Sequence, residues 1–211
     1  MKAFARIVGC KSMRLLVLAF GLAGWQTRAE GQGRAPATPK RTSASHKELK
    51  MNIVITSTAF KQGEPIPREH TGEGADRSPL LQWTNLPEGT KELALICDDP
   101  DAPVAEPWVH WVLYKLPATT KGLPEGMPQK PQLKEPAGAL QGKNGWPEGQ
   151  NIGYRGPMPP KGHGTHHYYF RLYALGKPID AQPGLDKKAL LAKIRDHVLA
   201  EGVLMGTYER R

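Results

Sequence analysis

Proline and glycine interrupt this chain throughout: 20 Pro and 23 Gly occur among 211 residues, against only four Phe. Such a composition favours many turns between short elements and argues against a helical bundle. A chain of this length has room for one well-buried domain with tails. We therefore expect a single domain that is all-β or mostly β, and we find no internal repeat in the sequence.

The N-terminal segment has the pattern of a secretory signal peptide. A basic stretch precedes the apolar residues 15–23, and small residues follow near Ala29. The alternative is a transmembrane anchor, but about nine apolar residues or glycines are far fewer than the roughly 20 that span a bilayer. We therefore predict a signal peptide over residues 1–29, beginning at Met1 or at Met13, and a periplasmic or secreted protein.

Residues 30–48 are small and polar without apolar periodicity, which predicts a flexible linker ahead of a domain over residues 49–211.

Residues 1–29 hold five basic groups and no acidic one, so the rest of the chain carries +4 of the total charge of +9. No cluster of Lys and Arg interleaved with aromatic residues is present, so we expect no nucleic-acid partner. No helical segment combines an apolar face with a strongly basic one, so we expect no stable membrane insertion. Cys97 would be the only cysteine after signal cleavage, and an internal disulfide is then impossible.

Apolar and β-branched runs alternate with turn clusters along the domain. Five runs are predicted to be strands: residues 51–58, 93–97, 108–116, 168–175 and 203–208. Two long connections, 61–80 and 121–165, are expected to hide further short strands, since long structureless loops are uncommon in a compact domain. One amphipathic helix is predicted over residues 187–201, because apolar residues recur there three and four positions apart and Gly202 follows.

The first motif that could carry chemistry is Cys97-Asp98-Asp99-Pro100-Asp101-Ala102-Pro103, directly after a predicted buried strand. Three carboxylates within four positions suit a metal site or a general base. Two prolines fix the backbone of the same turn, so a rigid, solvated acidic turn is the alternative. The motif alone does not decide between them.

Two further motifs contain histidines. In Trp108-Val109-His110-Trp111, strand alternation places His110 on the face of Trp108, and the alternative is an ordinary core histidine. The second is the Gly- and Pro-rich stretch 153–168, which holds three His and continues into an aromatic strand. Alternation there gives His166 the side of Tyr168 and His167 the opposite side.

Together with Ser78-Pro79-Leu80-Leu81-Gln82-Trp83, these motifs resemble the phosphatidylethanolamine-binding protein family, in particular its bacterial, Raf kinase inhibitor-like branch. The resemblance extends from about residue 51 to residue 211. It implies an antiparallel β-sandwich with long pocket-forming loops around a small pocket for phosphate or phospholipid head groups, and a cis Glu106-Pro107 peptide bond. The pocket residues that it implies are Asp99, Pro100, Trp108, His110, Pro160, His166 and Tyr168.

The residue types of this pocket suit anion binding. Two imidazoles can donate hydrogen bonds to an anion, more strongly when protonated. Asp99 would accept from an imidazole N–H and so orient the ring. We therefore expect a binding protein for small anions or phospholipid head groups, with no catalytic residue, cofactor or metal.

Two other functions are open at this stage. One is a protein-interaction regulator such as a protease inhibitor, with residues 121–150 as its protruding loop. The other is a zinc hydrolase that uses Asp99, His110, His163 and His166 as ligands.

Overall fold

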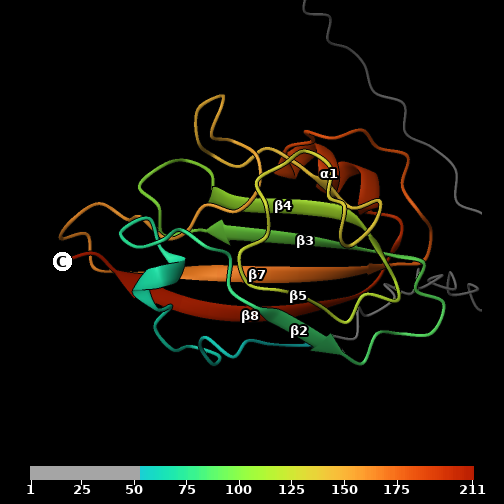
Figure 1. Cartoon of the computed structure of the whole chain (residues 1–211), viewed down its shortest axis with the longest axis horizontal. Helices are drawn as coiled ribbons and strands as arrows, with labels where there is room; N and C mark the ends of the chain where they lie inside the picture. The colour runs from blue at the N-terminus through green and yellow to red at the C-terminus, as the bar shows by residue number, and fades with distance from the viewer. Residues whose placement is uncertain (1–52) are drawn as a thin grey trace, which may run out of the picture. The chain divides into compact units, whose positions relative to one another are not determined.

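The computed structural model describes residues 53–211 (Figure 1). The predicted signal peptide and linker lie outside the described residues. The described part is mostly β, with antiparallel sheets and one α-helix near the C-terminus, as predicted. No helix within residues 53–211 is long and apolar enough to cross a membrane.

The larger sheet has five antiparallel strands. Their order across the sheet is β6 (Leu140–Gln141), β4 (Trp108–Pro117), β3 (Glu92–Asp99), β7 (Thr165–Leu175) and β8 (Val198–Glu209). Every residue of β3 is buried, because this central strand is covered on both faces. Its apolar residues follow one another without a polar residue between them, which is the sequence pattern typical of a strand buried on both faces.

The smaller sheet pairs β1 (Val54–Thr56), β2 (Leu81–Thr84) and β5 (Gly122–Leu123), again antiparallel. Its inward residues Leu81 and Trp83 join the same core cluster as Leu93 and Leu95 of β3. The two sheets therefore bury their facing side chains against each other, as in a β-sandwich.

The other face of the larger sheet is covered by α1 (Lys187–Ile194), which lies beside β4 in Figure 1. Leu190 and Ile194 of α1 pack with Ala94 and Ile96 of β3 in a second core cluster. The Asp186 carboxylate caps the helix by accepting the Ala189 N–H at 2.7 Å. A single-turn 3-10 helix, η1 (Arg68–His70), completes the elements.

The predicted helix was too long at its C-terminal end. It ends at Ile194, and β8 begins at Val198 and pairs with Leu175 of β7. Val198 and Leu199 fit the helical spacing, but both are equally suited to a strand, and pairing with β7 decides the outcome. The connection 121–165 does hide two short strands, β5 and β6, as expected, whereas the connection 61–80 holds the 3-10 helix η1 and no strand among its described residues.

The prediction of a cis Glu106-Pro107 bond was wrong. Among the described residues the cis peptide bond is Glu135-Pro136. The trans state is favoured even before proline, and the Glu106-Pro107 bond in the turn that leads into β4 is trans.

Candidate functional site

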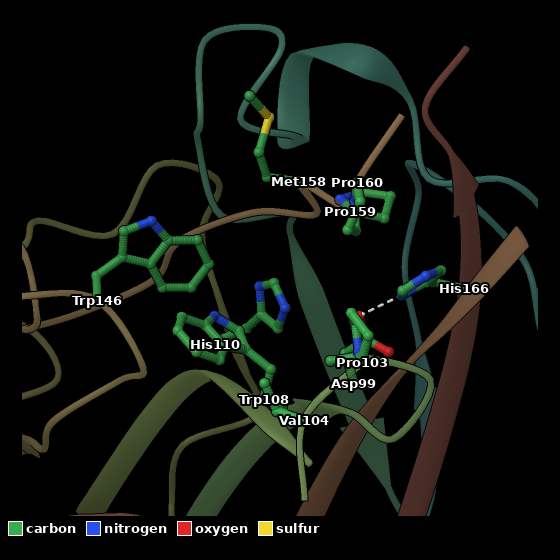
Figure 2. A pocket seen from close by; sticks show the side chains of 11 residues that line it. Asp99, Pro103, Val104, Trp108, His110, Trp146, Met158, Pro159, Pro160 and His166 are labelled. Carbon is green, nitrogen blue, oxygen red and sulfur yellow. Dashed lines mark hydrogen bonds and ion pairs between the residues drawn. The ribbon is translucent and has the colours of Figure 1, made fainter. Parts of the chain in front are cut away.

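A cavity of about 290 Å³ opens where the end of β3 meets the beginnings of β4 and β7 (Figure 2). These three strands are antiparallel neighbours, so Asp99 at the end of β3 lies opposite Trp108 at the start of β4. The polar residues that line the cavity are Asp99, His110 and His166. The apolar ones are Ala102, Pro103, Val104, Trp108, Trp146, Met158, Pro159 and Pro160.

His166 and Asp99 form a buried pair. The His166 ring is 1% exposed, whereas that of His167 is 40% exposed, as strand alternation predicts. The His166 Nδ1 lies 2.8 Å from Asp99 Oδ2. An ionised carboxylate can only accept, so Nδ1 carries the hydrogen and Nε2 is left to other partners.

The Asp99 carboxylate is itself held in place. Its Oδ1 accepts the backbone N–H of Asp101 at 2.8 Å, an Asx turn that fixes the acidic loop after β3. Both oxygens of Asp99 therefore have a donor, and the second donor is an imidazole. Asp99 therefore fixes the orientation of the His166 ring, as a carboxylate hydrogen-bonded to a histidine does in many protein sites.

His110 is fixed by a backbone group. Its Nδ1 donates to the carbonyl oxygen of Arg155 at 2.6 Å, and its ring packs edge-on against Trp146 and Tyr168. Burial lowers the pKa of His110, and the Arg155 carbonyl and the Asp99 charge only partly oppose this effect. At neutral pH the ring is therefore uncharged, with its Nε2 unprotonated.

Two tryptophans form one wall of the cavity: Trp108 at the start of β4 and Trp146 in the loop between β6 and β7. Trp108 and Trp146 meet edge to face, with ring centroids 5.6 Å apart. Gly145 lies against Trp108 so closely that a Cβ there would be 2.6 Å from the indole. Only glycine permits this approach, and it keeps the two indoles in contact.

The sequence did not predict several of these lining residues. Trp146 lies in the long connection between β6 and β7, where no periodicity marks a functional position. Val104 and Met158 are among the few exposed large hydrophobic residues, at 52% and 39% exposed, and both lie at this cavity. An apolar residue in a Pro-rich loop was the only available signal.

Two of the predicted pocket residues are not in its lining. Pro100 is exposed in the turn beyond Asp99. Tyr168 is fully buried behind His110, and its hydroxyl has no hydrogen-bond partner within residues 53–211. Burial, and then the nearby Asp99 charge, raise the pKa of Tyr168 far above its usual value.

Among residues 53–211, the cavity lining contains no Lys or Arg. In the same part of the chain, no group of three His, Cys, Asp or Glu side chains is placed to hold a metal ion. His163 lies outside the lining, yet its Nδ1 is 2.8 Å from His166 Nε2. The site is thus a polar floor of two fixed imidazoles and a carboxylate beneath an apolar rim.

The arrangement can be compared with known proteins. The model of the phosphatidylethanolamine-binding protein family matches residues 56–209. The chain belongs to this family. The chain is 44% identical over 156 residues to a UPF0098 protein of Methanothermobacter thermautotrophicus. This alignment covers 74% of the chain and 98% of the relative.

Solved structures of two other family members have the same fold. The crystal structure of Escherichia coli YbcL matches with a TM-score of 0.69 at 33% identity, over 76% of this chain and 99% of that one. Chlamydia trachomatis CT736, a PEBP homologue, matches with a TM-score of 0.65 at 36% identity, over 75% of this chain and 98% of that one. These matches confirm the predicted family, including its bacterial branch.

Proposed function

We propose that this protein binds small anions, phosphate or phosphate-bearing head groups, in the cavity at the ends of β3, β4 and β7. One observation carries the proposal: two buried imidazoles, His110 and His166, line the same cavity, and each has its Nδ1 tied to a fixed acceptor. In both rings Nε2 is the nitrogen on the opposite edge from that acceptor. It can donate to an anion as soon as the ring is protonated.

The charges of the lining restrict the kind of anion. Asp99 is the only carboxylate there, and no permanent cation balances it, so a fully ionised ligand gains nothing until a proton is added. That proton can be on an imidazole or on the ligand. The pocket therefore favours partly protonated anions or anions that also carry an ammonium group.

The apolar rim supports a ligand with an organic part. Val104 and Met158 are exposed at the cavity although their burial would be favourable, and Trp108 and Trp146 present indole surface beside them. A phosphate ester could place its phosphate on the polar floor and its carbon atoms against this rim. Phosphorylethanolamine is the simplest ligand that combines both properties.

Isothermal titration calorimetry with inorganic phosphate and with phosphorylethanolamine at pH 6 tests the proposal. We expect the wild type to bind both, and His166→Ala to remain folded by circular dichroism while its affinity falls at least about tenfold, the loss of a charge-assisted hydrogen bond. The matched control is His197→Ala, a histidine in the turn between α1 and β8 that is not in this lining and whose carbonyl oxygen accepts from Gly176, just beyond the other end of β7. If the wild type binds neither compound, the proposal is wrong.

We also propose that the protein is exported. The support is the basic, apolar and small-residue order of residues 1–29. Fractionation of cells that express the full chain should recover a protein shortened by the signal peptide outside the cytoplasm. Full-length protein in the cytoplasmic fraction would contradict export without affecting the anion site.

A further inference from the structure

His163 is the third histidine at this site and the only exposed one. It lies in the turn between Pro160, which lines the cavity, and β7. Its Nδ1 is 2.8 Å from Nε2 of His166, and the two ring centroids are 5.0 Å apart. His163 thus occupies the nitrogen of His166 that would otherwise be free to bind a ligand.

The contact permits only certain protonation states. Because His166 Nδ1–H donates to Asp99, one hydrogen lies between His166 Nε2 and His163 Nδ1, and either nitrogen can carry it. If both rings are protonated, two N–H groups point at each other across 2.8 Å, and the bond is lost. Histidine is the side chain that gains its charge between about pH 8 and pH 5, so acidification should break this contact.

We infer that His163 is a third imidazole of the anion site, which blocks His166 Nε2 in the empty pocket and becomes a second donor to the anion when both rings are protonated. This inference rests on the proposed function. An anion between the rings accepts from His166 Nε2–H and from His163 Nδ1–H, and its charge offsets their mutual repulsion. The preferred ligand is therefore an oxyanion with at least two free oxygens, such as a phosphate monoester.

The backbone around His163 allows the ring to move aside. Gly162 and Gly164 flank it with φ of +73° and +84°, and a Cβ at either position would have no atom within 4 Å. The turn itself is held by the hydrogen bonds from Gly162 N–H to the Arg210 carbonyl and from His163 N–H to the Pro160 carbonyl, both 3.2 Å. The ring can thus leave His166 while the turn stays attached to the sheet.

The charges around the two rings come from several strands and from the loops between them. Asp99 is bonded to His166, and Asp101 is bonded to His167 on the solvent side of β7. Other titratable or charged groups near the two rings are His110 on β4, Tyr168 on β7, Lys161 in the turn, Tyr208 and Glu209 on β8, Arg210 just after β8, and Glu73, which is hydrogen-bonded to Tyr208 and Arg210. Within this set only the imidazoles change charge between pH 5.5 and pH 8, so they set the pH dependence of binding.

The test compares the full-length wild type with His163→Ala, titrated by calorimetry with inorganic phosphate and with phosphorylethanolamine at pH 5.5 and pH 8. At pH 5.5 the variant should bind about tenfold more weakly, because one charge-assisted donor is gone. At pH 8 it should bind at least as tightly as the wild type, because His166 Nε2 is no longer blocked. The titration of the ligand itself affects both proteins equally, so the ratio of their affinities isolates His163.

Two further variants sharpen the result. His167→Ala removes the neighbouring imidazole, which is hydrogen-bonded to Asp101 outside the cavity. The ratio of this variant's affinity to that of the wild type should stay near one at both pH values. His163→Asn retains a neutral donor and should bind with a flatter pH profile than the wild type. A His163→Ala affinity ratio that is the same at pH 5.5 and pH 8 would overturn the role of His163 alone, whereas a wild type that binds neither compound overturns the anion site as well.

Discussion

Asp98 and Asp99 are neighbours on β3 and almost equally buried, at 4% and 3% exposed, but they face opposite layers of the molecule. Asp98 points toward α1, where it is paired with Lys187 and lies 3.7 Å from Arg171 Nε. Asp99 points into the cavity, where its charged-group partner is His166. One carboxylate is therefore paired with a Lys and an Arg, and the other is paired with an imidazole.

We expect this difference to separate an ion pair that stabilises the fold from one that takes part in ligand binding. Lys and Arg keep their charge at every physiological pH, so the Asp98 pair contributes the same stability throughout. A histidine partner makes the state of Asp99 depend on protons and on any anion that binds nearby. We expect that changes on the Asp98 side affect folding and that changes on the Asp99 side affect binding.

The largest expected effect lies on the Asp98 side. Lys187→Met removes the close cation and leaves a buried carboxylate with Arg171 alone, so the free energy of unfolding should fall by about 2–3 kcal/mol. Urea denaturation measures it. The control is Lys188→Met at the next, exposed position of α1, which should change stability by less than about 0.5 kcal/mol. Equal effects of the two variants would show that the pairing of Lys187 with Asp98 does not stabilise the fold.

A smaller effect is expected on the Asp99 side, and in binding. Asp99→Asn keeps an acceptor oxygen but removes the charge that favours protonated His166, so affinity for phosphate at pH 6 should fall about tenfold, or about 1.4 kcal/mol. Asp98→Asn should leave the affinity within about twofold. Tighter phosphate binding by Asp99→Asn would show that this carboxylate repels the anion more than it orients His166.

The smallest effect concerns pH. Because burial lowers the pKa of His110, the unfolded chain takes up a proton below about pH 6.5 that the folded protein resists. The contribution of His110 to stability is therefore complete above that pH and is lost on acidification, by at most about 1.4 kcal/mol per pH unit. Urea unfolding without phosphate at pH 7.5 and pH 5.5 should show a smaller loss in His110→Gln than in the wild type. The same loss in both proteins would show that His110 does not contribute to the pH dependence of stability.

The sequence predicted the long strands well because their side chains carry the signal locally. The buried run in β3 and the alternation of His166 with His167 in β7 can be recognised without knowing the partners. In contrast, β5 and β6 have two residues each, and only pairing with other strands makes them strands. The end of α1 was wrong for a related reason, since pairing of Val198 with β7 outweighs a helical spacing.

The site was predicted unevenly. The family resemblance assigned Asp99, His110 and His166 to one pocket, strand alternation separated His166 from His167, and the structure places the three residues around one cavity. Trp146 was missed because its position depends on how a long loop folds back onto Trp108. The contact of His163 with His166 was missed because turn geometry, rather than strand alternation, directs that ring.

The contact between Trp108 and Trp146 gives the protein an intrinsic optical probe. Among the described residues, Trp83 and Trp111 are buried in the core, while Trp108 and Trp146 border the cavity and are partly exposed. The emission of the core pair should stay constant while that of the cavity pair responds to the charge and polarity beside His110. Occupancy of the pocket can therefore be followed by fluorescence in the unlabelled protein, with Trp146→Phe reducing the signal.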